Sequence, residues 1–236
     1  VPARLYSIAN FMRYERPQRG REREFWQLNA DLFGVDGPMA DAEIIEMSYR
    51  SVLNFGARPD MFTVRVNNRQ LVNQLLGQFL GLDVIGANMM TKLLDKKNKI
   101  PPETFKQQAI EIFGAEGSRE GLPKLAQMIS MKSVDDLPAE LSDSPSVQQI
   151  RTVMDLLRQK GVTNAVFDVT LMRGLDYYTG TVFEFFDNAP ENNRAMFGGG
   201  RYDGLVGLFG VEPMATVGVG MGATTMQVFL EVHGLL

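Results

Sequence analysis

The first thirty-four residues carry the pattern of two strands joined by a polar loop. Residues 13–24 form the loop, and mainly apolar segments lie on either side of it. In the second strand, a period of two places five side chains on one face: Phe25, Gln27, Asn29, Asp31 and Phe33. The middle of that face is polar, and polar groups buried without partners are costly. We therefore expect a ligand or a solvated cleft over this face, and we expect Trp26, on the opposite face, to pack in the core.

The rest of the chain alternates between helical and strand patterns. Apolar positions at helical spacing predict helices over residues 41–54, 70–80, 146–160 and 224–232. Short apolar runs flanked by turn residues predict strands over residues 61–66, 165–171, 181–186 and 215–221. Strand pairs with short loops and peripheral helices are typical of an α+β fold on an antiparallel sheet, rather than of a βαβ wind.

Lysine is confined to one part of the chain. All eight lysines lie between Lys92 and Lys160, and every basic residue outside that window is arginine or the single histidine. Residues 86–160 also have almost no strand pattern and carry several short amphipathic helices. We interpret residues 86–145 as a helical module inserted into a core that residues 1–85 and 146–236 form.

The composition limits the kinds of catalytic and metal sites that the chain can form. The chain has 24 Lys and Arg residues and 28 Asp and Glu residues, which gives a net charge of −4. This charge argues against a general nucleic-acid coat protein, although it is compatible with a local basic patch. The lack of cysteine excludes disulfides, thiolate zinc sites and cysteine nucleophiles. The single histidine, His233, excludes Ser-His-Asp catalysis and multi-histidine metal sites. Chemistry must therefore rest on Arg, carboxylates, Tyr, Gln and backbone amides, and no metal site made by protein ligands is predicted.

Two further features concern the location and extent of the chain. No apolar run is long enough to span a bilayer and no leader opens the sequence, so a soluble cytoplasmic protein without a membrane partner is expected. The sequence opens with Val1-Pro2 inside an expected strand, and we interpret it as an internal piece of a longer protein.

The polar loop is dense in arginine. Five arginines fall within eleven residues, at positions 13, 16, 19, 21 and 23. The planar guanidinium grips phosphate or carboxylate with two bonds, so a hairpin carrying these side chains over a cleft would suit a polyphosphate. The alternative is a solvated hairpin in which the arginines pair with the glutamates of the same loop.

Three other segments combine glycine with strands. Residues 173–178, Arg-Gly-Leu-Asp-Tyr-Tyr, follow an apolar strand, where a fold can hold side chains in a cleft; the alternative is a surface turn with core aromatics. The glycine run 198–200 leaves backbone amides open to a ligand, without the spacing of a dinucleotide-binding loop. The alternating Gly218, Gly220 and Gly222 flatten one face of a strand, so something must pack tightly or bind there.

Taken together, these segments resemble the signature motifs of one family. Residues 13–27 resemble motif 2 of the class II aminoacyl-tRNA synthetases, in the form that histidyl-tRNA synthetases carry. Residues 173–178 with 181–184 resemble the histidine-specific signature of that family, and residues 198–203 resemble its second signature. The inserted module also lies where the family has a helical insertion. The resemblance implies the antiparallel α+β fold of the class II catalytic domain, with residues 1–85 and 146–236 as its catalytic core.

The resemblance implies five residues at the ATP substrate. Arg13 matches the motif 2 arginine that clamps the α-phosphate of ATP and the carboxylate of the amino acid. Arg173 matches a family-specific second arginine on the same phosphate, and these two are the expected catalytic residues. Phe25 matches the residue that stacks on adenine, while Glu15 and Arg21 match loop residues around the adenine and the outer phosphates. ATP is expected to bind with Mg²⁺.

The resemblance also implies the residues that bind histidine. Gln27 and Asp31 lie on the polar strand face and match positions that contact the amino group and the imidazole. Asp31 stands where many relatives have Glu, and either carboxylate can accept an imidazole N–H. Tyr177 and Tyr178 match tyrosines on the imidazole side, and Arg173 also borders the bound histidine.

The implied activity is that of a histidine–tRNA ligase. Histidine attacks the α-phosphorus of ATP, pyrophosphate leaves, and the 3′ end of tRNA(His) takes the histidyl group. No protein nucleophile is needed, which agrees with the composition. The expected partners are tRNA(His), histidine, ATP and a second copy of the chain in a homodimer.

The sequence also departs from the family pattern. The segment that precedes motif 2, with the dimer-forming motif 1, and an anticodon-binding domain after Leu236 are absent from the sequence. The motif 3 arginine that stacks on adenine has no counterpart in Gly220-Met221-Gly222-Ala223-Thr224-Thr225. We expect from these departures that the isolated chain charges tRNA poorly or not at all.

Two alternatives to the ligase stay open at this point. Some synthetase paralogues bind histidine and regulate another enzyme, as the regulatory subunit of ATP phosphoribosyltransferase does. A different class of function would be an α+β module whose arginine loop grips RNA phosphates only, with binding that weakens steeply as salt rises.

Overall fold

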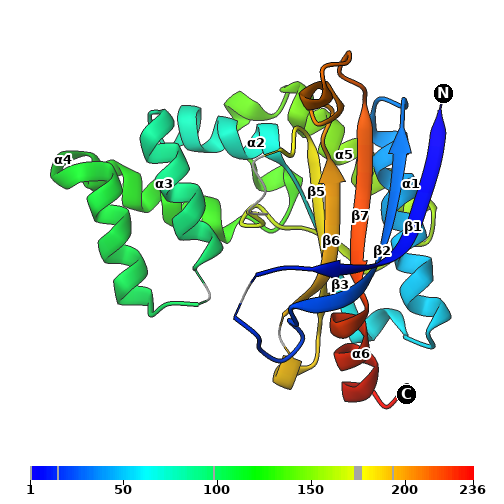
Figure 1. Ribbon diagram of the computed structural model, residues 1–236. Helices are drawn as coiled ribbons and strands as arrows, with labels where there is room; N and C mark the ends of the chain where they lie inside the picture. The colour runs from blue at the N-terminus through cyan, green and yellow to red at the C-terminus, as the bar shows by residue number, and fades with distance from the viewer. Residues whose placement is uncertain (1, 15, 98, 173–176, 193) are drawn as a thin grey trace.

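The computed structural model describes residues 2–14, 16–97, 99–172, 177–192 and 194–236. In these residues, seven strands form one sheet in the order β1-β2-β7-β6-β5-β3-β4 (Figure 1). The strands are β1 (Ala3–Met12), β2 (Glu24–Phe33), β3 (Phe62–Asn68), β4 (Ala165–Phe167), β5 (Thr181–Asp187), β6 (Ala195–Arg201) and β7 (Thr216–Gly222). Neighbouring strands are antiparallel except β3 and β4, which are parallel. The predicted α+β fold on an antiparallel sheet is confirmed.

Helices cover one face of this sheet. The α-helices are α1 (Pro38–Asn54), α2 (Arg69–Gln74), α3 (Val84–Asp95), α4 (Pro102–Ser130), α5 (Pro145–Gln159) and α6 (Ala223–Val232). The π-helix η2 (Leu75–Phe79) continues α2, and short 3₁₀ turns are η1 (Pro59–Met61), η3 (Val134–Asp136), η4 (Ala139–Leu141), η5 (Pro190–Asn192) and η6 (Val206–Phe209). No helix in the described part of the chain has both the length and the apolarity that crossing a membrane requires.

The two faces of the central strands differ in composition because strand residues alternate between faces. One face carries large apolar side chains of β2, β7, β5 and β3, which form the core with α1, α5 and α6. The opposite face carries the polar residues of β2 and four glycines, which the register places side by side: Gly218 and Gly220 of β7, and Gly200 and Gly198 of β6. This glycine-lined floor is the part of the fold on which the site stands.

The sequence patterns missed one strand and misjudged one side chain. Residues 198–200 form the centre of β6, where the glycines pair with β5 and β7, whereas we expected their backbone amides to be open to a ligand. Trp26 is 55% exposed rather than part of the core. It precedes the first residue of β2 that pairs with β7, Gln27, so only the edge strand β1 lies beside it.

The predicted strand over residues 165–171 is also shorter than expected. It ends at Phe167 because the side chain of Asp168 accepts hydrogen bonds from the backbone N–H and the hydroxyl of Thr170, at 2.9 and 2.7 Å. Such a local turn competes with strand pairing.

Helices α3 and α4 extend away from the sheet to one side (Figure 1). They belong to the region that we interpreted as a module of residues 86–145, and α3 begins at Val84, close to that boundary. Gly114, with φ of +74°, interrupts α4 and turns its two halves relative to each other. Apolar residues of this region, among them Met90 and Met128, share one continuous buried cluster with the sheet.

Candidate active site

The arginine-rich loop is a defined hairpin that connects β1 to β2. The backbone of Arg13 donates to Arg23 O at 2.8 Å, and Gln18 and Arg21 exchange two backbone hydrogen bonds, of 3.0 and 2.8 Å, at the tip. Gly20 has φ of +74° inside that tip, a conformation that glycine adopts without strain. The hairpin tip rests on α6, because Gly20 lies close to the methyl group of Thr225.

Arg13 and Phe25 face each other at the base of this hairpin. The Arg13 guanidinium lies 4.2 Å from the centroid of the Phe25 ring, and its Nε donates to Glu22 O at 2.9 Å. The ring contact and the Nε hydrogen bond hold the guanidinium in place, while the Nη groups stay available for a planar anion. No carboxylate in the described part of the chain pairs with Arg13.

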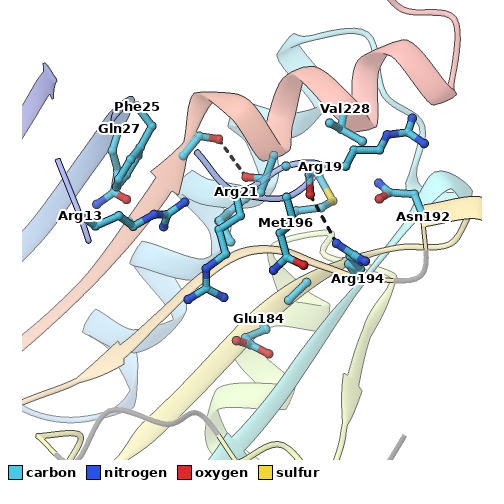
Figure 2. A pocket seen from close by; sticks show the side chains of 17 residues that line it. Arg13, Arg19, Arg21, Phe25, Gln27, Glu184, Asn192, Arg194, Met196 and Val228 are labelled. Carbon is cyan, nitrogen blue, oxygen red and sulfur yellow. Dashed lines mark hydrogen bonds between the residues drawn. The ribbon is translucent and has the colours of Figure 1, made fainter. Parts of the chain in front are cut away.

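A cavity of about 340 Å³ opens beside this pair, under the hairpin (Figure 2). The predicted residues Arg13, Arg21, Phe25 and Gln27 all line it. The remaining walls come from β5, β6, β7, the β5–β6 connection and the start of α6. Arginine forks around a space of this size provide the donors that a phosphate-bearing molecule requires.

A second cavity, of about 320 Å³, lies on the same face of the sheet. The predicted residues Gln27, Asp31, Tyr177 and Tyr178 line it. Gln27 and Gly220 line both cavities, so the two spaces meet there. Gln27 therefore lies at the junction of the two cavities. Of the other predicted residues, three line only the first cavity and three line only the second.

The glycines of β7 make room for the polar side chains of β2. A Cβ atom at Gly218 would overlap Asp31 Oδ1 and the Tyr202 hydroxyl, and one at Gly220 would lie 2.9 Å from Gln27 Nε2. A Cβ at Gly200 of β6 would lie 2.8 Å from the ring of Tyr178. The flattening that the alternating glycines predict is thus observed, and the side chains of β2 and the tyrosines occupy the space.

Hydrogen bonds and ring contacts organise the second cavity. Tyr202 donates its hydroxyl to Asp31 Oδ1, and Gln27 Nε2 donates to Asn29 Oδ1 at 2.6 Å. The rings of Tyr177 and Tyr178 lie 4.8 Å apart, and that of Tyr177 meets Tyr202 edge to face at 5.8 Å. The result is a carboxylate and an amide facing aromatic walls, which suits a small flat molecule with N–H donors.

Burial changes the acidity of both partners in the Tyr202–Asp31 bond. Burial raises the pKa of Asp31 above its ordinary value of 3.8, and the hydrogen bond from Tyr202 opposes part of that rise. Burial and the neighbouring carboxylate raise the pKa of Tyr202, so its hydroxyl keeps its proton and remains the donor.

A buried ion pair behind the site holds the end of β6. Arg201 and Asp41 of α1 are 2% and 0% exposed and lie 2.7 Å apart, and Asp41 also accepts from the Thr181 hydroxyl at 2.6 Å. Arg201 also donates to Asp203 at 3.1 Å. These bonds connect α1, β5 and β6 at Arg201, the residue that precedes Tyr202.

Two predicted site residues, Glu15 and Arg173, lie outside the described residues. The cavity linings also include three charged residues and one tyrosine that were not among the predicted site residues: Arg19, Arg194, Glu184 and Tyr202. Glu184 and Tyr202 fall within quoted family motifs, and Arg19 within the loop, whereas no pattern in the sequence points to Arg194. His233, the single histidine, is bonded to Asp187 at 2.8 Å, and neither residue lines either of these two cavities.

Among the described residues, no three His, Cys, Asp or Glu side chains lie close enough to hold an ion together.

Comparisons with known proteins agree on one family. A family model described as histidyl-tRNA synthetase matches residues 1–225. The histidine–tRNA ligase of Leptospira biflexa serovar Patoc is 36% identical over 236 residues, covering 100% of this chain and 54% of that protein. That of Pyrococcus furiosus is 36% identical over 245 residues, covering 100% of this chain and 55% of that protein. The crystal structure of histidyl-tRNA synthetase from Nostoc sp. PCC 7120 has the same fold, with a TM-score of 0.81, 24% identity, and coverage of 100% of this chain and 56% of that one. The chain spans about half the length of these relatives.

Proposed function

The chain belongs to the histidyl-tRNA synthetase family, and we propose that it provides the catalytic core that activates histidine with ATP and charges tRNA(His). The observation that carries the proposal is the meeting of the two cavities at Gln27. One cavity has the arginines that a nucleotide phosphate requires, and the other has the carboxylate and tyrosines that an imidazole requires. Adenylate formation needs these two substrates joined end to end.

In the first proposed step, a carboxylate oxygen of histidine attacks the α-phosphorus of ATP. The bond from that phosphorus to the β-phosphate oxygen breaks, and pyrophosphate leaves with the electron pair. Arg13, held over the Phe25 ring, would neutralise charge on the α-phosphate, and Arg173 is proposed for the same phosphate. Positioning and electrostatic stabilisation then supply the rate, without a protein nucleophile.

Substrate recognition is proposed to divide between the two cavities. Phe25 would stack on adenine, and Glu15 and Arg21 would contact the adenine and outer phosphates. Gln27 and Asp31 would accept from the amino group and imidazole of histidine, with Tyr177 and Tyr178 beside the ring. An amino acid without an imidazole would leave Asp31 with the Tyr202 hydroxyl but without the imidazole N–H as a donor, and this loss is the physical basis of specificity.

Mg²⁺ is proposed to enter with ATP. Magnesium is usually held by one or two carboxylates together with substrate phosphates, and Glu184 supplies one carboxylate in the first cavity. The ion would offset the charge of the triphosphate when bound.

We propose that the second step transfers the histidyl group from the adenylate to a ribose hydroxyl at the 3′ end of tRNA(His), with AMP leaving. The reaction is expected in the cytoplasm. Residues 86–145 are proposed as a separate module because α3 and α4 extend away from the sheet (Figure 1). The regulatory-subunit alternative is not favoured, since the curated relatives above are histidine–tRNA ligases.

A homodimer is also proposed. Tyr6, Ile8, Met12 and Trp26 are exposed on β1 and β2, on the face away from the cavities. Apolar side chains gathered on one face are a common mark of an interface. Sedimentation of the chain and of its Tyr6→Glu variant tests this; a monomer in both cases would contradict a dimer formed through this face.

The test of the activity is ATP–pyrophosphate exchange with each amino acid in turn, together with calorimetric titration of histidine and ATP. We expect binding of both and exchange with histidine only. Arg13→Lys keeps the charge but loses the fork, so exchange should fall on the order of a hundredfold. Arg50→Lys, on the exposed side of α1, is the matched control. If the chain binds neither substrate, or exchanges equally with other amino acids, the proposal is wrong.

A further inference from the structure

The outer end of the first cavity carries two arginines that the proposed function leaves without a role. In Figure 2, Arg13 lies beside Phe25 and Gln27, Arg21 follows it, and Arg19 and Arg194 lie beyond. Arg19 comes from the tip of the hairpin, and Arg194 from the connection between β5 and β6. Segments more than 170 residues apart in the sequence therefore bring cations to one wall.

Hydrogen bonds with neighbouring segments hold Arg194 in its position. Its Nη1 donates to Arg19 O at 3.4 Å, which holds the two segments together. The connection that carries it is tied to buried Asp187, which accepts from the Asn192 side chain at 2.7 Å and from Ala189 N at 2.8 Å. His233, which directly follows α6, also bonds to Asp187. Arg194 thus projects from an anchored segment.

Charge in this part of the cavity is unbalanced. Four arginines line the cavity, and Glu184 is the carboxylate among its described lining residues. Neither Arg19 nor Arg194 has a carboxylate within 4.0 Å among the described residues. The facing wall from α6 offers Thr225 and Val228, which carry no charge. Cations that share a cavity repel one another unless an anion lies between them.

We propose that Arg194, supported by Arg19, binds the β- and γ-phosphates of ATP and receives the pyrophosphate as it leaves. This inference rests on the proposed function, which puts the α-phosphate at Arg13. A triphosphate extends outward from that point along the row of arginines. When the bond between the α-phosphorus and the bridging oxygen breaks, negative charge develops on the pyrophosphate, where these guanidinium groups can stabilise it.

The experiment compares AMP, ADP and ATP, with and without Mg²⁺, by calorimetric titration of the wild type and of the Arg194→Gln and Arg19→Gln variants. We expect Arg194→Gln to weaken ATP binding roughly tenfold and AMP binding less than about twofold, because only the outer phosphates lose a charged partner. Arg19→Gln should also weaken the binding of ATP more than the binding of AMP. Arg119→Gln, on an exposed part of α4, is the matched control, and thermal melts verify that each variant is folded.

The other outcomes distinguish a failure of this inference from a failure of the proposed function. Equal losses for AMP, ADP and ATP in Arg194→Gln would mean that the residue shapes the pocket rather than binds phosphate, and the inference would be wrong. Unchanged ATP affinity in a folded variant would also overturn it, while the proposed function would stand. A wild-type chain that binds none of the three nucleotides would contradict the proposed function itself.

In the exchange reaction, Arg194→Gln should raise the KM for ATP and leave the KM for histidine unchanged. A rise in the KM for histidine of the same size would contradict a role at the phosphates.

Discussion

The hydroxyl of Tyr202, just after β6, donates a hydrogen bond to Oδ1 of Asp31 in β2. Strand β7 lies between these two strands, and the bond crosses it directly above Gly218. A side chain at position 218 would occupy the space in which the two groups meet. The bond therefore depends on residues from three strands, and it fixes the carboxylate proposed to bind imidazole.

Tyr202→Phe removes this donor and leaves the ring in place. Asp31 then loses the hydrogen bond that orients it, and we expect histidine affinity to fall roughly tenfold, as for a lost bond to a charged group. ATP affinity should stay unchanged, because Tyr202 lines the second cavity and not the first. Calorimetric titration of both substrates measures the two effects. Tyr6→Phe, on the opposite face, is the control; an unchanged histidine affinity in Tyr202→Phe would contradict the role of the bond.

Asp31→Asn should raise the stability of the protein while it weakens histidine binding. Folding raises the pKa of Asp31 above 3.8, so the folded state holds this proton more tightly than the unfolded state. The stability from this group is therefore present at low pH and is lost as the pH rises through the raised pKa. We expect Asp31→Asn to be more stable than the wild type at about pH 7.5. The difference between their free energies of unfolding should become smaller toward about pH 4.

Denaturant unfolding of both proteins across that range measures this difference. Asp143→Asn, at an exposed aspartate outside the cavities, controls for loss of a charge. If the difference between Asp31→Asn and the wild type widens on acidification, the direction assigned to the Asp31 pKa is wrong.

Gly218→Ala tests whether the floor must be flat. The added methyl group would overlap Asp31 Oδ1 and the Tyr202 hydroxyl and lie 3.0 Å from Ala30 O. We expect a loss of about 1–3 kcal/mol in the free energy of unfolding, as for other overpacked sites, and a loss of histidine binding. Gly204→Ala is the matched control, because a Cβ there meets nothing within 4 Å. Chemical denaturation measures the stability of both variants, and calorimetric titration measures their histidine binding. Equal effects of Gly218→Ala and Gly204→Ala would contradict the requirement for glycine at position 218.

Much of the site could be predicted from local patterns. Alternation in residues 25–33 placed Gln27, Asn29 and Asp31 on one face, and the structure puts all three at the second cavity. The alternating glycines of β7 predicted a flattened face, and the space above them is occupied by those side chains. Both inferences need only the period of a strand.

Features that depend on distant pairings could not be predicted in the same way. The glycine run 198–200 has no apolar strand pattern in the sequence, and only its pairing with β5 and β7 shows that it forms a strand. Arg194 has no local pattern, and it reaches the cavity because β6 begins beside the hairpin tip. Trp26 looks like a core residue until the sheet order shows that β7 does not extend to it.

Asp41→Ala should cost far more stability than the loss of an exposed acidic partner. Removing Asp41 leaves the Arg201 guanidinium buried with an incomplete set of partners, and a broken buried pair typically costs about 3–5 kcal/mol. Asp155→Ala, which breaks the exposed pair with Arg158, should cost less than about 1 kcal/mol. The double variant Asp41→Ala/Arg201→Met removes the stranded charge and should be more stable than Asp41→Ala alone. Denaturant midpoints of the four proteins, wild type included, give the comparison. If the double variant is as unstable as Asp41→Ala, the buried charge is not what makes the single substitution costly, and the hydrogen bond from Thr181 to Asp41 becomes the explanation to test.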